Sequence, residues 1–168
     1  MAWIAAPPPI AAKLEVAKQA ADLCTGALDQ RIVYDVWKRG VIAARLPALR
    51  TYYQEKRRVM EQALRRELGD LVSWPEPKGG FFLWASLHGV NTDALLERAI
   101  AQRVVYVAGS AFFVDGRSSE QVRLSFSAPS HARIEEGIRR LAAAVREELG
   151  DPARRRGTTH LSEASRSA

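Results

Sequence analysis

The stretch "VRLSFSAPS", residues 122–130, contains the side chain with the clearest chemical potential. Val122, Leu124 and Phe126 alternate with polar residues, which predicts a strand with one buried face. The first of the polar residues is Arg123, and a guanidinium is a planar charged fork that suits a carboxylate. The pattern alone leaves two interpretations of Arg123 open, a solvent-facing residue or a ligand for an anion.

Two glycine-containing loops are candidates for the surroundings of this arginine. "PKGGFFLW" places Gly79 and Gly80 directly before a predicted strand, and "VAGSAFF" places Ser110 directly after another. Paired glycines before a strand indicate either a bulge or tight turn or a close approach of the backbone to a ligand. Together with Arg123 on a nearby strand, the two loops could line a cleft.

Other chemistry has no support in the residue pattern. The sequence contains no nucleophile elbow, phosphate-binding loop, dinucleotide-binding glycine signature or cluster of metal ligands, so we predict no catalytic and no metal-binding residue. His88, His131 and His160 are far apart in the sequence. The single cysteine, Cys24, excludes an internal disulfide and a cysteine-rich zinc site, and we expect it to be a small buried hydrophobic residue.

The composition is that of an ordinary globular protein, with 168 residues, 47% of them hydrophobic and 26% charged. No apolar run reaches the roughly 18 residues that a membrane span needs, and the opening "MAWIAAPPPIAA" lacks a basic leader. The formal net charge is +6, but the arginines lie beside glutamates, as in "QALRREL", which is typical of solvated helix faces. We therefore predict a cytoplasmic protein with no membrane and no nucleic-acid partner.

Hydrophobic periodicity predicts a helical N-terminal portion followed by a compact α/β unit at about 71–149. The first six residues are interpreted as the end of a strand. Helices are predicted at about 10–25 and 28–39, and a long one from residue 43 or 46 to residue 68. In the α/β unit the predicted strands are 80–87, 104–107 and 122–127, with helices at 92–102 and 131–149 packed on one face of the sheet.

Four segments, in this order, resemble the C-terminal portion of fold-type I, pyridoxal-phosphate-dependent aminotransferases of class I and II, particularly the 2-aminoadipate aminotransferase group. They are "WIAAPPPIAAKLEVAKQAADLCTGALDQ", "PKGGFFLWASL", "TDALLERAIAQRVVYVAGSAFF" and "VRLSFSAPSHARIEEGIRRLAAAVRE". The resemblance implies an α/β fold, namely the family's small domain with a short, mostly antiparallel sheet and helices on one face. Linking helices from the large domain would precede it.

The resemblance also implies a site. Arg123 matches the family's arginine for the substrate α-carboxylate, Gly79 and Gly80 match its glycine pair, and Ser110 matches the serine of its "PGS" turn, in which Ala108 here replaces proline. The implied cofactor is pyridoxal 5′-phosphate, and the implied substrates are an amino acid and a 2-oxo acid. Family members are homodimers, so a dimer is implied as well.

The family's Schiff-base lysine has no match here. None of the five lysines, Lys13, Lys18, Lys38, Lys56 and Lys78, stands in its context, and we expect none to be desolvated enough to replace it. The expectation is therefore a fragment without cofactor-binding residues that is inactive alone. Its expected parts are the end of the large cofactor domain (1–42), a long connecting helix (43–70), the small α/β domain (71–150) and a disordered tail (151–168).

Two other functions are compatible with the same sequence. One is the aminotransferase-like effector portion of a transcription regulator that carries a winged-helix DNA-binding domain. The other is a non-catalytic remnant that serves as an interaction module. The sequence does not identify the amino donor or acceptor in any of these cases.

Overall fold

The computed structural model describes residues 2–117 and 119–150. The chain divides into two compact units, Met1–Arg50 and Thr51–Ala168. The predicted tail at 151–168 lies outside the described residues. Each unit is described by itself below.

The N-terminal unit consists of helices. They are α1 (Pro8–Ala21), α2 (Ala27–Lys38) and the first turns of α3 (Val41–Leu68). Proline stands at the start of α1, where its missing N–H is not needed by the helix. The prediction of a strand end in the first six residues is wrong: residues 2–7 form no strand, and no other described segment offers them a ladder of hydrogen bonds.

None of the described residues up to Arg50 is buried. The expectation of a buried Cys24 is therefore wrong: it follows the end of α1 and is exposed, because this unit has no core to cover it. Many large apolar side chains of the unit are equally uncovered: Trp3, Ile4, Ile10, Leu14, Val16, Leu23, Leu28, Ile32, Tyr34, Trp37, Val41, Ile42, Leu46 and Leu49.

Helix α3 is longer than the pattern predicts. It begins at Val41, right after Gly40 in a left-handed conformation (φ 72°), so Pro47 lies inside the helix and not in its first turn. The buried positions of α3 belong to its C-terminal half and begin at Lys56. Four apolar ones, Met60, Ala63, Leu64 and Leu68, form a face at helical spacing.

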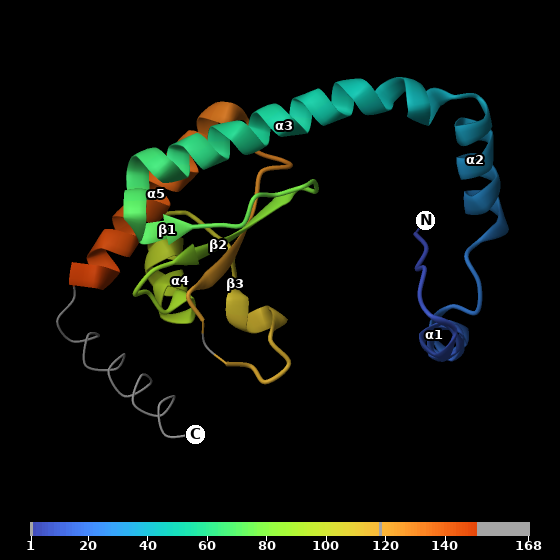
Figure 1. The fold of residues 1–168 in the computed structure, drawn as a ribbon, viewed down its shortest axis with the longest axis horizontal. Helices are drawn as coiled ribbons and strands as arrows, with labels where there is room; N and C mark the ends of the chain where they lie inside the picture. Colours follow the sequence, from blue (N-terminus) through green and yellow to red (C-terminus); the bar gives the residue numbers. More distant parts are fainter. Residues whose placement is uncertain (1, 118, 151–168) are drawn as a thin grey trace. The chain divides into compact units, whose positions relative to one another are not determined.

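The second unit contains a four-stranded antiparallel sheet of order β1-β2-β4-β3, drawn in Figure 1. Its strands are β1 (Val72–Ser73), β2 (Phe82–Leu87), β3 (Val107–Ala108) and β4 (Gln121–Ser125). The α/β class and the antiparallel sheet confirm the predicted fold class. Strand β1 was not among the three predicted strands, because the sequence pattern of its segment predicts only an extended chain leading to the next strand.

The predicted strand 104–107 is mostly wrong, since only its last residue pairs in the sheet. The N–H of Val104 donates to the carbonyl of Ala99 at 2.8 Å, and the hydroxyl of Tyr106 donates to the carbonyl of Thr92. Both acceptors belong to helix α4 (Thr92–Ala101). Val104 and Tyr106 therefore bind the helix before the chain enters β3.

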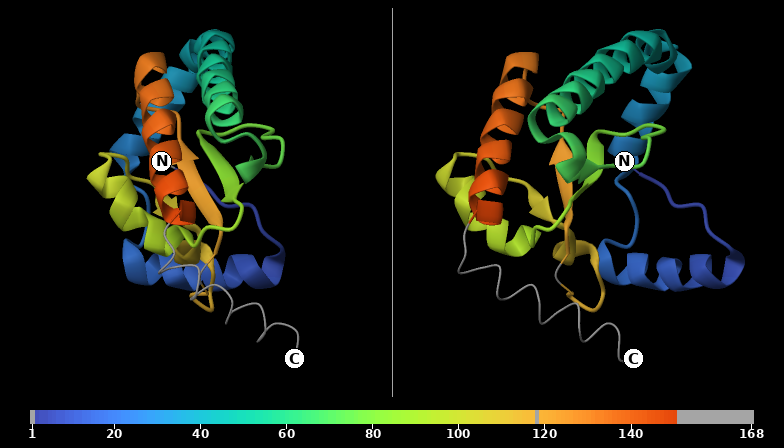
Figure 2. Two further views of the ribbon diagram at one scale, coloured as in Figure 1. Left: turned by 90° about the vertical axis from the view of Figure 1, so that its left-hand side faces the viewer. Right: turned by 60° about the vertical axis from the view of Figure 1, so that its left-hand side comes forward.

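The core fills one face of the sheet. Leu83, Ala85 and Leu87 of β2 and Val122 and Leu124 of β4 are buried, and the residues between them are not. They form one apolar cluster with residues of α3, α4 and α5 (His131–Gly150). Both predicted helices of this unit are confirmed to within a residue, and Figure 2 shows α5 beside the C-terminal half of α3.

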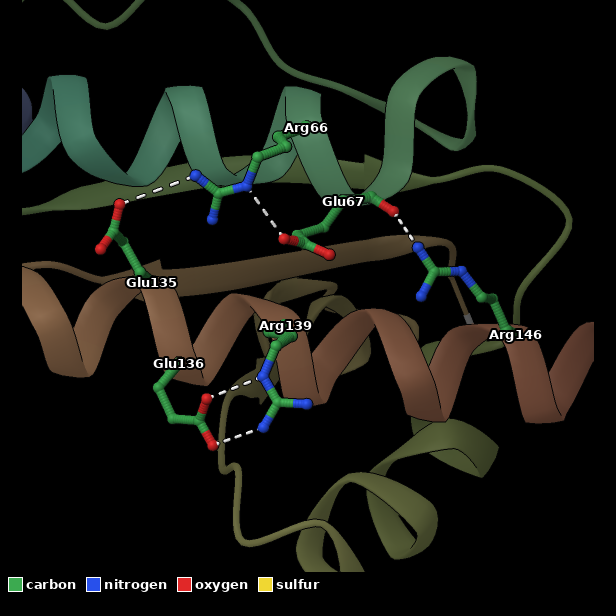
Figure 3. Close-up of polar contacts among 6 residues, drawn as sticks. All are labelled: Arg66, Glu67, Glu135, Glu136, Arg139 and Arg146. Atoms are coloured by element: carbon green, nitrogen blue, oxygen red, sulfur yellow. Dashed lines mark hydrogen bonds and ion pairs between the residues drawn. The ribbon is translucent and has the colours of Figure 1, made fainter.

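Polar contacts also join α3 and α5, as Figure 3 shows. Arg66 of α3 lies 3.7 Å from the carboxylate of Glu135, and Arg146 donates to the main-chain carbonyl of Glu67. Within α5, Arg139 binds Glu136 through two hydrogen bonds of 2.7 and 2.8 Å. These contacts connect the helices that cover one face of the sheet. The other face carries polar and aromatic residues.

Candidate functional site

Arg123 stands in the middle of the uncovered sheet face. Its neighbours across the ladder are Trp84 on β2 and Val107 on β3. Since Val122 and Leu124 on either side of it point into the core, the arginine side chain must leave from the opposite face. The strand alternation read from the sequence therefore places Arg123 on the side away from the helices.

Aromatic rings surround the guanidinium of Arg123. Its central carbon lies 4.4 Å from the ring centre of Phe82 and 5.0 Å from that of Phe112. Phe112 in turn meets Trp84 edge to face at 5.1 Å. Stacking against rings attracts the cation and orients its plane. In the part of the chain that the structure describes, Arg123 has no ion pair with a carboxylate, so its forked donors are not committed to an internal acid.

These aromatic residues were not among the sequence candidates. A signal for two of them existed in "FFLW", where Phe82 and Trp84 alternate with the buried Leu83 and so share a face with the arginine. Phe112 had no such signal, because it lies in the short 3₁₀ helix η2 (Gly109–Phe112).

Gly109 explains how Phe112 comes so close. A Cβ at this position would lie 2.9 Å from the main-chain oxygen of Gln121 and 2.2 Å from the hydroxyl oxygen of Ser119. Only glycine lets η2 pack this tightly against the start of β4. The glycine of the "AGS" turn thus brings an aromatic ring to Arg123.

Ser110 is bound to a neighbouring helix. Its hydroxyl donates to the carboxylate of Asp93 in the first turn of α4, whose N-cap is Asn91. This contact fixes η2 to α4. The predicted contact of Ser110 with a substrate stays a prediction.

The glycine pair lies in a bend directly before β2. Gly80 has a φ of 90°, which favours glycine, and a Cβ at Gly79 or Gly80 would meet no atom within 4 Å. The loop is held from α3, where Arg57 donates to the carbonyl of Pro77 at 2.6 Å. Open space therefore borders the loop two residues before Phe82, while a contact of the two glycines with a substrate stays a prediction.

The family model of aminotransferases of class I and II matches residues 3–141 of this sequence. The chain belongs to this family. The recognition made from its four segments is thereby confirmed.

Among its relatives, the aromatic-amino-acid aminotransferase 1 of Thermococcus litoralis is 40% identical over 148 residues, which cover 88% of this chain and 36% of the relative. The 2-aminoadipate transaminase of Thermus thermophilus is 38% identical over 147 residues, 87% of this chain and 37% of the relative. The aminotransferase chain thus spans little more than a third of the length of these relatives.

A solved structure agrees with these matches. The α-aminoadipate aminotransferase LysN of Thermus thermophilus, crystallised with N-(5′-phosphopyridoxyl)-L-leucine, superimposes with a TM-score of 0.73 at 39% identity, over 86% of this chain and 37% of that one. An HTH-type transcriptional regulator of Bacillus subtilis, YisV, is also similar, at 28% identity over 86% of this chain and 30% of the relative. Aminotransferase-like sequence therefore occurs in both enzymes and regulators.

The lysines of this aminotransferase chain do not fit the aldehyde of the cofactor that the family implies. A Schiff-base lysine needs a free, desolvated amine. Lys56 is buried, with 2% of its surface exposed, and donates to the carbonyl of Ser127 at 2.7 Å. Lys56 is thus buried, but its ammonium is bound within the protein, and the expectation that no lysine is desolvated enough to form the Schiff base stays a prediction. Lys18 pairs with Asp22, and the side chains at three further positions are exposed: Lys13, Lys38 and Lys78.

Among residues 2–117 and 119–150, no three His, Cys, Asp or Glu side chains gather closely enough to hold a metal ion. Within the same ranges, no helix combines the length and the apolar character that crossing a membrane requires.

Proposed function

We propose that this chain supplies the arginine that binds the substrate carboxylate in a pyridoxal-phosphate-dependent aminotransferase. The reaction moves an amino group between an amino acid and a 2-oxo acid. The observation that carries the proposal is that the Arg123 guanidinium lies over the rings of Phe82 and Phe112 and pairs with no carboxylate among the described residues.

The geometry suits this role for a physical reason. Amino acids and 2-oxo acids both carry a carboxylate next to the reacting carbon, so one cation can bind the substrate of either half-reaction. A guanidinium can present two parallel N–H groups to the two carboxylate oxygens. The substrate is then fixed in orientation as well as in place, which an ammonium cannot achieve.

The chain positions the substrate through its carboxylate, and the bound cofactor supplies the electron sink of transamination. Since the described lysines do not fit its aldehyde, we propose that this chain by itself does not transaminate. We further propose that residues 1–42 belong to the large cofactor domain and that the intact protein is a homodimer, as the family resemblance implies. We also propose a cytoplasmic location, as the composition suggests.

The role of Arg123 is tested by anion titration of the chain. Arginine side chains are labelled with ¹⁵N, and the Nε signal of Arg123 is identified by its absence in Arg123→Lys. Addition of 2-oxoglutarate at constant ionic strength is expected to shift this signal in a saturable manner. Arg117, whose central carbon lies 4.1 Å from the ring centre of Phe113 and whose guanidinium is paired with Asp115 at 3.5 Å, is the control, and its signal is identified through Arg117→Lys.

Equal shifts of Arg123 and Arg117 would mean that the anion responds only to the general positive charge of the chain. The specific carboxylate role would then be wrong. A saturable shift confined to Arg123 supports it.

The inactivity of the chain is tested by reduction. The chain is mixed with pyridoxal phosphate, treated with borohydride and digested, and modified lysines are mapped by mass spectrometry. We expect no single lysine to be labelled stoichiometrically, because the four other lysines are solvated or ion-paired and Lys56 is bound to Ser127. Full labelling of one lysine, together with turnover of an amino acid and 2-oxoglutarate, contradicts the proposal.

A second candidate function has support from the similarity to the Bacillus subtilis regulator. In that case the same arginine would bind an effector carboxylate in a protein that also binds DNA. The coding sequence upstream of Met1 distinguishes the candidates: a Schiff-base lysine segment without a DNA-binding domain supports the enzyme, and a winged helix supports the regulator.

A further inference from the structure

Lys56 is a buried cation without an acidic partner. It lies on α3 with 2% of its surface exposed, and within the described residues no carboxylate pairs with it. Its Nζ donates to the main-chain carbonyl of Ser127 at 2.7 Å and lies 4.8 Å from the ring centre of Tyr52. Burying a charge is unfavourable unless its hydrogen bonds are satisfied, so this carbonyl and the ring are its main compensation.

The carbonyl that Lys56 binds lies where the β2–β4 ladder ends. Strand β4 ends at Ser125, and the next main-chain bond, from Phe126 N–H to the carbonyl of Phe81, is 3.1 Å long. Ser127 follows immediately. Lys56 therefore ties down the chain directly behind the last rung of the ladder.

The last rungs of this ladder carry the platform of Arg123. Phe82 is paired with Ser125, and Arg123 is two residues before Ser125 on the same face, with its guanidinium over the Phe82 ring. Fraying from the free end of the ladder would reach this pair first. The Phe112 ring, in contrast, is held by η2 and its contacts with α4 and β4.

The neighbouring residue of α3 holds the other strand. Arg57 donates to the carbonyl of Pro77 in the loop that leads into β2, and Tyr53 packs on Phe81 at 4.7 Å between ring centres. One turn of α3 thus binds both strands at the end where Phe82 meets Arg123.

We propose that Lys56 is a positioning residue for Arg123: its bond to the Ser127 carbonyl keeps the end of the β2–β4 ladder closed and so holds the Phe82 ring against the guanidinium. The inference rests on the proposed role of Arg123 for its functional meaning. The effect of Lys56 on the conformation of Arg123 is measurable without any substrate.

The test compares Lys56→Met, which keeps an unbranched apolar side chain and removes the ammonium with its donors, with Lys56→Arg, which keeps charge and donors. Two quantities are measured in the full chain by NMR: the hydrogen-exchange rate of the Phe126 amide and the shift and order parameter of the Arg123 Nε–H group. Lys38→Met is the matched control, because Lys38 also lies over a tyrosine ring, that of Tyr34 at 5.8 Å, but in an exposed position.

We expect Lys56→Met to raise the exchange rate of the Phe126 amide at least tenfold and to lower the order of Arg123 Nε–H. Lys56→Arg is expected to restore both, and Lys38→Met to change neither. If Lys56→Met leaves both within twofold of wild type, or if Lys56→Arg fails to restore them, the proposal is wrong. Should Lys56→Met not fold by circular dichroism, the same measurements on Lys56→Leu, which also removes the donors, decide with the same criteria.

The failure of this inference is separate from the failure of the proposed function. A wild-type Arg123 signal that ignores 2-oxoglutarate contradicts the carboxylate role alone. An Arg123 signal that responds to 2-oxoglutarate but is indifferent to Lys56→Met contradicts only the positioning role.

Discussion

Arg123 is oriented by rings and not by an acid, and this choice matters for what it can bind. An internal carboxylate would orient the guanidinium equally well but would occupy the donors that a substrate needs. The ring centres of Phe82 and Phe112 lie 4.4 and 5.0 Å from its central carbon, and neither ring accepts a strong hydrogen bond from the N–H groups. Phe82 and Phe112 therefore position Arg123 without using the N–H donors that a substrate carboxylate needs.

The close approach at Gly109 is tested by Gly109→Ala. The added methyl would meet the main-chain oxygen of Gln121 at 2.9 Å, so we expect a loss of about 1–3 kcal/mol in the free energy of unfolding from overpacking. Urea unfolding followed by circular dichroism measures it.

Gly137→Ala is the matched control for that substitution. Gly137 lies inside α5, and a Cβ there would meet nothing within 4 Å. We expect this change to stabilise the protein by up to about 1 kcal/mol, because alanine favours a helix interior. Equal destabilisation by the two changes would contradict the packing argument for Gly109.

At the level of elements, α5 combines a buried apolar stripe with an ion-pair cluster on its exposed side. Arg139 and Arg140 both donate to Glu136, and Figure 3 shows the pair formed by Arg139. These hydrogen bonds, that of Arg139 first, lower the pKa of Glu136 from 4.5 to about 2. Since the cluster is exposed, its net contribution to stability is small and sensitive to salt.

The sign of the pH dependence follows from this lowered pKa. The ionised carboxylate of Glu136 is favoured in the folded state, so its contribution is fully present above about pH 4.5 and is lost as the pH falls towards 2. We expect Glu136→Gln to flatten the decline of the unfolding free energy in this range. Urea titrations between pH 2 and 6 measure it.

Glu147→Gln, an exposed glutamate on the same helix, is the control for that titration. It is expected to leave the slope unchanged. A slope that Glu147→Gln changes as much as Glu136→Gln does would assign the effect to overall charge.

At the level of the whole chain, burial is distributed unequally between the two units. All buried residues of the described ranges lie at or after Lys56, in the second unit, whereas the first unit exposes Trp3 at 86% and Trp37 at 65%. Apolar surface of this extent indicates a face that another protein surface covers. The proposed large domain and dimer are consistent with it.

We expect the full chain to self-associate as its concentration rises and a chain limited to residues 51–168 to do so much less. The shorter chain keeps every buried residue of α3 and the whole sheet, so it should remain folded. Sedimentation velocity over a hundredfold concentration range, with circular dichroism as a check on folding, measures both. If the two chains associate equally, the exposed helices of the first unit are not the cause.

Local patterns in the sequence determined much of this protein. Alternation around Arg123 identified β4 and the face of its arginine, and helical periodicity identified α4 and α5 to within a residue. These features are readable because burial of one face imposes a period of two on a strand and of 3.6 on a helix. The family resemblance added the meaning of the arginine, which a period cannot supply.

Only the tertiary structure decided what surrounds the arginine. Phe112 reaches it through the close contact at Gly109. Lys56 donates to a carbonyl 71 residues away in the sequence, and Val104 and Tyr106 bind α4 in place of a strand partner. Each depends on which segments meet across the fold. A periodic pattern shows that one face of an element is buried, but it does not show which residues cover that face. The partners of such a contact lie far apart in the chain and therefore produce no local pattern in the sequence.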